Sequence, residues 1–198
     1  RKVGSGYDLP IALAYLIATR QIPGKPFGDC LISGELSLVG HVRNVAGLFA
    51  YALQAQREHM RLLSGPVTTC MPELGQLEHL CLDHLSGLRT NSFSRPRVIA
   101  VQPACAQLDY ADVVGQETAV RALAIAAAGQ HGVLLVGPPG SGKSMLARRL
   151  PSILPPLDER ERREAALIHS VVGDDLSSIT AGVRPFRSPH HTASAAAL

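Results

Sequence analysis

The stretch Gly137-Pro138-Pro139-Gly140-Ser141-Gly142-Lys143-Ser144 decides the fold of the second half of the chain. It matches the pattern G-x-x-x-x-G-K-[ST] between an apolar run at 133–136, which predicts a strand, and a run at 145–150, which predicts a helix. Its glycines allow a tight turn whose N–H groups can face one anion. Lys143 can reach the outer phosphates of ATP, and the Ser144 hydroxyl can ligate Mg²⁺. These eight residues therefore predict a Mg-ATP site, and the alternative is a Gly/Pro turn that binds nothing.

Composition favours an ordinary soluble protein. The chain has 198 residues, of which 46% are hydrophobic and 18% are charged. No window of about 18 apolar residues is present, so the sequence predicts no membrane span. It also shows no signal sequence, which favours a cytoplasmic location. The net charge of +3 neither indicates nor excludes a nucleic-acid partner.

The four cysteines do not indicate a metal site or a disulfide framework. They form no C-x-x-C pair, and a set with neighbouring histidines matches no common zinc-finger spacing. Reduced thiols in a cytoplasmic protein are the better interpretation. The cysteines are Cys30, Cys70, Cys81 and Cys105, and the set with histidines would be Cys70, His79, Cys81 and His84.

The first half predicts a small α+β domain. Asp8 is in position to cap a helix, and glycine turns separate short apolar runs that suggest strands. The expected strands are 29–33, 35–39 and 41–45. Helices are expected at 9–20 and 47–62, and a third is expected near Leu74 to Leu85.

Three stretches of this half, Gly4 to Ala12, Ser33 to Leu36 and Gly40 to Leu48, resemble the proteolytic domain of Lon-type proteases, as carried by the ComM/YifB branch of magnesium-chelatase-like proteins. The resemblance implies a Lon-like (ribosomal S5 domain 2-like) domain over residues 1–88. It places the Ser nucleophile of active Lon proteases at Gly6 and the Lys base at Phe49. Neither residue can do that chemistry, so the domain is expected to be degenerate, and these two residues argue against the alternative of a Ser/Lys peptidase.

Residues 89–108 are rich in Arg, Pro, Ser and Gln and predict a linker. The D-V-V-G-Q-E box at 112–117 then precedes an expected helix, Glu117 to Ala128. With the phosphate loop, this order resembles AAA+ ATPases, which implies a partial α/β P-loop domain over 109–198. The resemblance implies that Val114 and Gly115 lie against the adenine and ribose, whereas the alternative is a simple lead-in to the helix.

Two acidic stretches after the loop imitate a Walker B strand. The segment Ile153 to Glu159 contains two prolines that a central strand would not tolerate, and the segment Val171 to Asp175 is interrupted by Gly173. Asp158 instead predicts a helix cap, with Glu161 completing a capping box. The acidic pair that would orient the metal and the attacking water is therefore not found, and hydrolysis by this chain is doubtful.

Residues 184–194 match the R-P-F-R-[AS]-P-H-H-T-[AS]-S signature and resemble the magnesium-chelatase-like AAA+ clade. Arg184 and Arg187 could contact DNA or a neighbouring subunit, or could pair within the chain. His190 and His191 are adjacent, so in an extended segment they point apart and do not predict a metal site.

Taken together, the resemblance implies an ATP-binding fragment of a ComM-like AAA+ motor that acts on branched DNA in competence and recombination. The family forms homo-hexamers, which is doubtful for this chain. The absence of an initial Met and the end within an alanine-rich run suggest a piece of a longer protein. A non-catalytic nucleotide-binding module from a truncated gene remains the alternative.

Overall fold

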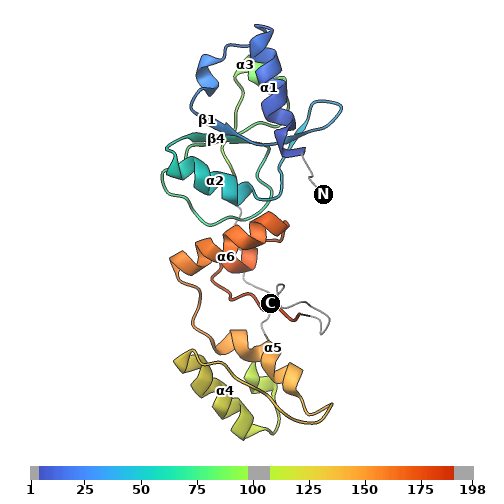
Figure 1. Ribbon diagram of the computed structural model, residues 1–198, viewed down its shortest axis with the longest axis vertical. Coiled ribbons are helices and arrows are strands. Elements are labelled where there is room, and N and C mark those ends of the chain that lie inside the picture. The colour runs from blue at the N-terminus through green and yellow to red at the C-terminus, as the bar shows by residue number, and fades with distance from the viewer. Residues whose placement is uncertain (1–4, 98–107, 190–198) are drawn as a thin grey trace.

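A three-stranded parallel sheet forms the centre of the first half of the computed structural model, which describes residues 5–97 and 108–189 (Figure 1). Its order is β1-β4-β5, and Leu62 of the central strand pairs with Leu31 on one side and His79 on the other. A separate two-stranded antiparallel sheet joins β2 to β3. The strands are β1 Cys30–Ile32, β2 Glu35–Leu36, β3 Val42–Arg43, β4 Arg61–Ser64 and β5 His79–Cys81.

Helices cover both faces of the parallel sheet. Successive side chains of a strand point to opposite faces, so the fully buried Leu62 and Leu63 belong to two different clusters. Leu62 packs with Ala52 and Ala55 of helix α2 (Leu48–Arg57), while Leu63 packs with Leu9 and Leu13 of helix α1 (Asp8–Ala18). The chain from β1 to its parallel neighbour β4 passes through α2, as a parallel connection requires.

The prediction of a helix near Leu74 to Leu85 is wrong. This segment supplies β5, and only the short helix α3 (Gly87–Thr90) follows it. β5 pairs with the open edge of β4, and both its end residues, His79 and Cys81, are buried. A three-residue strand is too short to show alternation in the sequence, so pairing with a distant strand decided its structure.

Two helix ends also differ from expectation. α2 ends at Arg57 rather than at Leu62, because His59 adopts a left-handed backbone (φ 54°) and Leu62 is drawn into the sheet. Asp8 does not cap α1. The 3₁₀ turn η1 (Ser5–Tyr7) precedes the helix, and Asp8 is the first residue of α1. The Asp8 carboxylate accepts a hydrogen bond from the Leu36 N–H at 3.4 Å instead.

The described part of the span expected to be a linker lies against the first half. Phe93 packs edge-on against Phe27, with ring centroids 6.3 Å apart. Ser94 and Cys81 exchange two backbone hydrogen bonds of 2.8 and 2.9 Å. Residues 89–97 therefore extend the packed surface of the first half before the chain leaves it.

Residues 108–189 contain helices but no strand among the residues described. The prediction of a strand at 133–136 is therefore wrong: the run has no regular secondary structure, and Leu134 and Val136 are 86% and 85% exposed. A strand needs a neighbour to take its backbone hydrogen bonds, and this part of the structure offers none. The elements are the 3₁₀ turn η3 Tyr110–Asp112 and helices α4 Glu117–Gly129, α5 Lys143–Ile153, α6 Glu159–Val172 and α7 Ser177–Thr180.

Several local expectations for this half are confirmed. α4 covers the expected helix, and Asp158 and Glu161 form the capping box that begins α6. Neither Walker B imitation is a strand, since residues 153–159 join α5 to α6 and Gly173 ends α6 with φ 86°.

No helix in the described ranges has the length and apolar character needed to traverse a bilayer.

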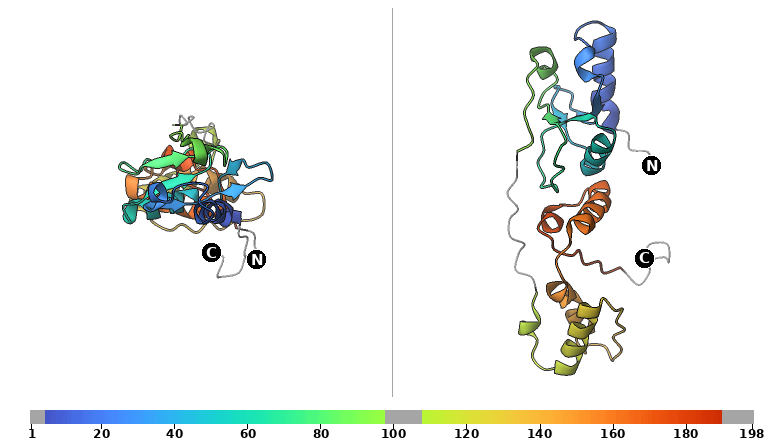
Figure 2. Two further views of the ribbon diagram at one scale, coloured as in Figure 1. Left: turned by 90° about the horizontal axis from the view of Figure 1, so that it is seen from above. Right: turned by 90° about the vertical axis from the view of Figure 1, so that its left-hand side faces the viewer.

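α6 joins the two halves by packing across the amino-terminal end of α2 (Figures 1 and 2). Phe49 of α2 is fully buried in a cluster from both halves, and Ser170 of α6 binds two amides at the start of α2. The Gly47 N–H donates to the Ser170 carbonyl at 2.7 Å, and the Phe49 N–H donates to the Ser170 hydroxyl at 3.2 Å. The other buried members of the cluster are Leu157, Ala166, Leu176 and Ile179.

Candidate functional site

The loop at 137–144 turns sharply into α5. Gly140 and Gly142 have φ values of 79° and 86°, a left-handed region in which side chains are strained, and Gly142 is the N-cap of α5. The Ser141 N–H donates to the Pro138 carbonyl at 3.3 Å and closes the turn. The local sequence thus produces the tight bend that was predicted from its glycines.

Lys143 folds back over this loop. Its ammonium donates to the carbonyl oxygens of Gly137 and Pro138 at 2.8 and 2.7 Å and to the Ser141 hydroxyl at 3.2 Å. These partners are uncharged, so the positive charge of Lys143 is not neutralised by them. The cation is therefore held within the bend, at the start of the helix.

The amino-terminal end of α5 adds to this positive potential. Its N-cap is a glycine without a side-chain cap, and its first turn carries no acidic residue. Such a helix end has free N–H groups and a partial positive charge, which favours an anion. Ser144 is exposed in the same turn. The donors, the cation and the hydroxyl fit the phosphates of a nucleotide and its metal ion.

The segment 109–110, just before the box, lies against α5. The buried Tyr110 donates its phenolic hydrogen to the Leu146 carbonyl at 2.6 Å, and Arg149 Nε donates to the Asp109 carbonyl at 2.8 Å. Burial raises the pKa of Tyr110 above its ordinary value, although the nearby Arg149 opposes this. The residues just before the box are thereby fixed to the helix that follows the phosphate loop.

Within the box, Val114 is 97% exposed and Gly115 has a φ of 73°. Gln116, which the sequence interpretation did not single out, reaches the loop: its Nε2 donates to the Ser141 carbonyl at 2.9 Å. This contact spans 25 residues, so no spacing rule along the chain could have indicated it.

The described arginines of the 184–194 signature pair within the chain. Arg184 binds both carboxylate oxygens of Glu161, at 3.1 and 2.9 Å. Arg187 donates to Asp174 at 2.8 Å, and this contact is the main reason that the pKa of Asp174 lies below its ordinary value; His169 also contributes. Internal pairing was one of the alternatives for these arginines. His190, His191 and the rest of the signature lie outside the described residues.

The positions that the Lon resemblance assigns to a catalytic pair are filled differently. Phe49, at the position of the base, is buried in the cluster between the halves. At Gly6 an added Cβ would lie 3.5 Å from Val45 and 3.7 Å from the Tyr51 hydroxyl. The base position therefore serves packing between the halves.

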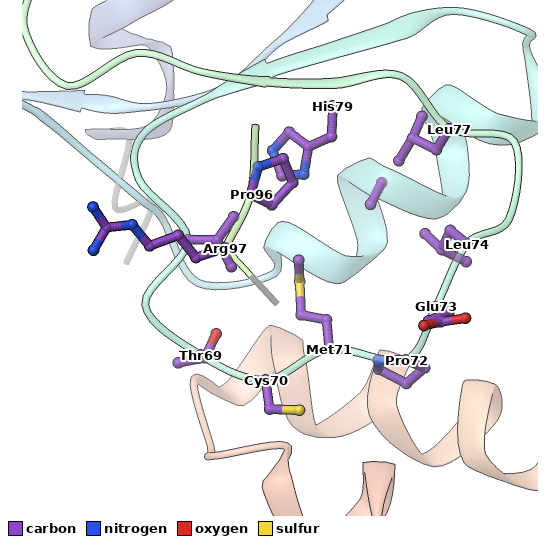
Figure 3. Close-up of a pocket in the computed structure, with 12 residues that line it drawn as sticks. Thr69, Cys70, Met71, Pro72, Glu73, Leu74, Leu77, His79, Pro96 and Arg97 are labelled. Carbon is purple, nitrogen blue, oxygen red and sulfur yellow. The ribbon is translucent and has the colours of Figure 1, made fainter. Parts of the chain in front are cut away.

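A mostly apolar cavity of about 210 Å³ lies beside α2 (Figure 3). Cys70 and His79 line it, whereas Cys81 and His84 line a different hollow, so these four residues do not surround one point. Among the residues described, no three His, Cys, Asp or Glu side chains are grouped to hold a metal ion. The described cysteines, Cys30, Cys70 and Cys81, are buried, and burial raises the pKa of Cys30 and Cys81.

Comparison with known families agrees with this organisation. Residues 109–198 match the family described as magnesium chelatase, subunit ChlI, and residues 1–67 match the family described as subunit ChlI of Mg-chelatase. The chain is 40% identical over its whole length to the uncharacterized protein YifB of Salmonella typhimurium. It is 35% identical, also over its whole length, to the competence protein ComM of Haemophilus influenzae.

The chain therefore belongs to the magnesium-chelatase-type family. Within that family it belongs to the ComM/YifB-like group. It spans 40% of the length of the YifB relative and 41% of the ComM relative. A shorter match, 37% identical over 36% of this chain and 10% of the relative, is to the archaeal Lon protease of Methanothermobacter thermautotrophicus.

Proposed function

We propose that this chain binds Mg-ATP through the loop 137–144. The observation that carries the proposal is the position of Lys143, which is held by neutral oxygens in the bend at the uncapped start of α5. A phosphate has negatively charged oxygens to offer, and these are stronger partners for an ammonium than carbonyl oxygens are. Lys143 would therefore move from the loop carbonyls to the outer phosphates when nucleotide binds.

The other residues of the site have separate roles in this proposal. The N–H groups of the loop and of the first turn of α5 would bind phosphate oxygens, and the Ser144 hydroxyl would hold Mg²⁺. The metal ion would neutralise charge on the phosphates. Val114 and Gly115, which precede the Gln116 contact to the loop, would border the base and ribose.

At the level of the whole protein, we propose an AAA+ motor that acts on DNA. A degenerate Lon-like domain (1–88) would be followed by a linker and by the first part of the P-loop domain (109–198). Family membership and the name of the ComM relative support a role in competence. ATP turnover by the full-length protein, measured with and without forked DNA, tests this proposal. Nucleotide binding without turnover would favour the non-catalytic alternative.

Lys143→Ala is expected to weaken Mg-ATP binding by about ten- to a hundredfold, since a hydrogen bond to a charged group contributes about 1.5–3 kcal/mol. Isothermal titration of the purified chain measures this change. Lys25→Ala, which removes an exposed lysine from the other half, is the control and is expected to bind as the unmodified chain does. Equal affinities of the Lys143 variant and the control would contradict the assignment.

A further inference from the structure

Gln116 stands where the box meets the phosphate loop. It is the N-cap of α4 and has a left-handed backbone (φ 59°, ψ 29°). Its carbonyl accepts the Val120 N–H at 3.0 Å and so begins α4, while its side chain makes no capping hydrogen bond to that helix. The side-chain amide nitrogen lies 2.9 Å from the Ser141 carbonyl oxygen. One residue thus begins α4 and also contacts the loop that begins α5.

This contact fixes the orientation of one peptide plane in the loop. In a trans peptide the C=O and the following N–H point in opposite directions, so a bound Ser141 carbonyl sets the direction of the Gly142 N–H. The Ser141 hydroxyl is held as well, by Lys143 at 3.2 Å. Residue 141 is therefore restrained through both its backbone and its side chain.

The left-handed backbone of Gly142 (φ 86°) is the reason for a glycine at this position. A Cβ added there would lie 2.8 Å from Gln116 Nε2, so the end of the glutamine side chain would have to shift. A side chain at residue 142 would therefore also disturb the contact between Gln116 and Ser141.

The support from which Gln116 reaches the loop is firm. Hydrogen bonds of 2.6 and 2.8 Å tie Tyr110 and Asp109, just before the box, to Leu146 and Arg149 of α5. Tyr110 also packs with the buried Leu123 of α4 and Leu146 of α5. The chain on both sides of Gln116 is therefore anchored in this cluster, while the Gln116 side chain itself is exposed.

We propose that Gln116 is a positioning residue for phosphate binding: its amide holds the Ser141–Gly142 peptide so that the loop is shaped to receive a polyphosphate. The proposal rests on the proposed function of the loop. It requires a donor at this position, since a carboxylate there would face the Ser141 carbonyl with a second acceptor.

The test uses two variants of similar size and one matched control. Gln116→Met removes the donor, and Gln116→Glu replaces it by an acceptor. The control is Gln130→Met: Gln130 is exposed at the other end of α4 and has the same left-handed backbone (φ 55°). Each protein is titrated with Mg-ATP and with inorganic triphosphate in the presence of Mg²⁺, and its thermal midpoint is measured.

Loss of one neutral hydrogen bond is expected to weaken Mg-ATP binding about three- to tenfold in Gln116→Met, and more in Gln116→Glu. Triphosphate binding is expected to weaken by the same factor, because the effect is on the loop. Gln130→Met is expected to match the unmodified chain. Unchanged affinities in Gln116→Met would overturn the proposal. So would a loss confined to ATP, which would assign Gln116 to the base instead.

Failure of the proposed function can be recognised separately, because the unmodified chain would then bind neither ligand. Hydrogen exchange of the amides of residues 140–142 tests the positioning role without any ligand. Faster exchange of these amides in Gln116→Met than in Gln130→Met is expected. Equal exchange rates in the two variants would refute a positioning role even in a chain that binds no nucleotide.

Discussion

Replacing Phe49 by alanine is expected to lower the free energy of unfolding by about 3–5 kcal/mol, the range measured for large buried aromatic residues. Phe49 is 0% exposed and contacts residues of both α6 and α7 in the cluster that joins the halves. A cavity left there cannot collapse easily, because Ser170 holds the backbone of α2 at Gly47 and Phe49. Urea denaturation followed by circular dichroism measures the change.

The matched control is Phe186→Ala, since Phe186 is 44% exposed and lies outside this cluster. We expect it to cost less than about 1 kcal/mol, as substitutions away from a packed core usually do. Equal losses in the two variants would show that Phe49 does not anchor the halves.

Phe49→Lys tests whether the position of the Lon-type base can hold a lysine in this chain. The substitution restores the residue type that the Lon resemblance assigns to this position, but it places an ammonium among Leu157, Leu176 and Ile179 without a partner of opposite charge. Burying an unpaired charge is strongly unfavourable. We therefore expect the variant to lose the packing between the halves or to unfold. It is not expected to degrade casein in any case, because Gly6 supplies no nucleophile. A variant that unfolds in urea at the same midpoint as the unmodified chain would contradict this account.

Acidification is expected to destabilise the protein through His79. This buried imidazole lies 2.7 Å from the Ser64 hydroxyl, and burial lowers its pKa from 6.5 to about 4. Because the pKa is lower in the folded state than in the unfolded state, the unfolded state binds the proton first as the pH falls. Stability is therefore complete above about pH 6.5, declines between pH 6.5 and 4, and has lost about 3 kcal/mol from this group below pH 4.

Urea unfolding at pH 7.5 and at pH 4.5 measures this decline in the unmodified chain and in His79→Gln. The variant is expected to lose about 2–3 kcal/mol less over this interval, since the glutamine does not titrate. His59→Gln changes an exposed histidine of the same half and should follow the unmodified chain. If His79→Gln shows the full decline as well, other groups must cause it.

The sequence predicted those features whose cause lies within a few residues. The glycines of 137–142, the helix after them, the helix at 117–128 and the Asp158–Glu161 cap depend on local backbone chemistry, and the structure has each of them. The assignment of the loop to Mg-ATP stays a prediction. Features decided by distant partners were missed or misread. β5 forms because it pairs with β4, which lies about fifteen residues earlier in the chain. Residues 133–136 do not form a strand, because no described strand pairs with them.

The site shows the same division. Lys143 and its loop could be recognised from their spacing, whereas the Gln116 contact to Ser141 and the Ser170 contacts to α2 join residues far apart in the chain. Phe49 could be recognised only as a residue unable to act as a base. Its role in joining the halves required knowledge of α6, which lies more than a hundred residues further along the chain.

The segment between α5 and α6 limits how far these two helices can move independently of each other. Pro155 and Pro156 restrict its backbone, and the Leu157 N–H is fastened to the Gly182 carbonyl at 2.8 Å. We therefore expect a tilt of α5 to displace α6 as well. A shift of α6 would in turn move the backbone of α2, whose Phe49 N–H is hydrogen-bonded to Ser170. A displacement of α5 is therefore expected to be passed on to the first half of the chain.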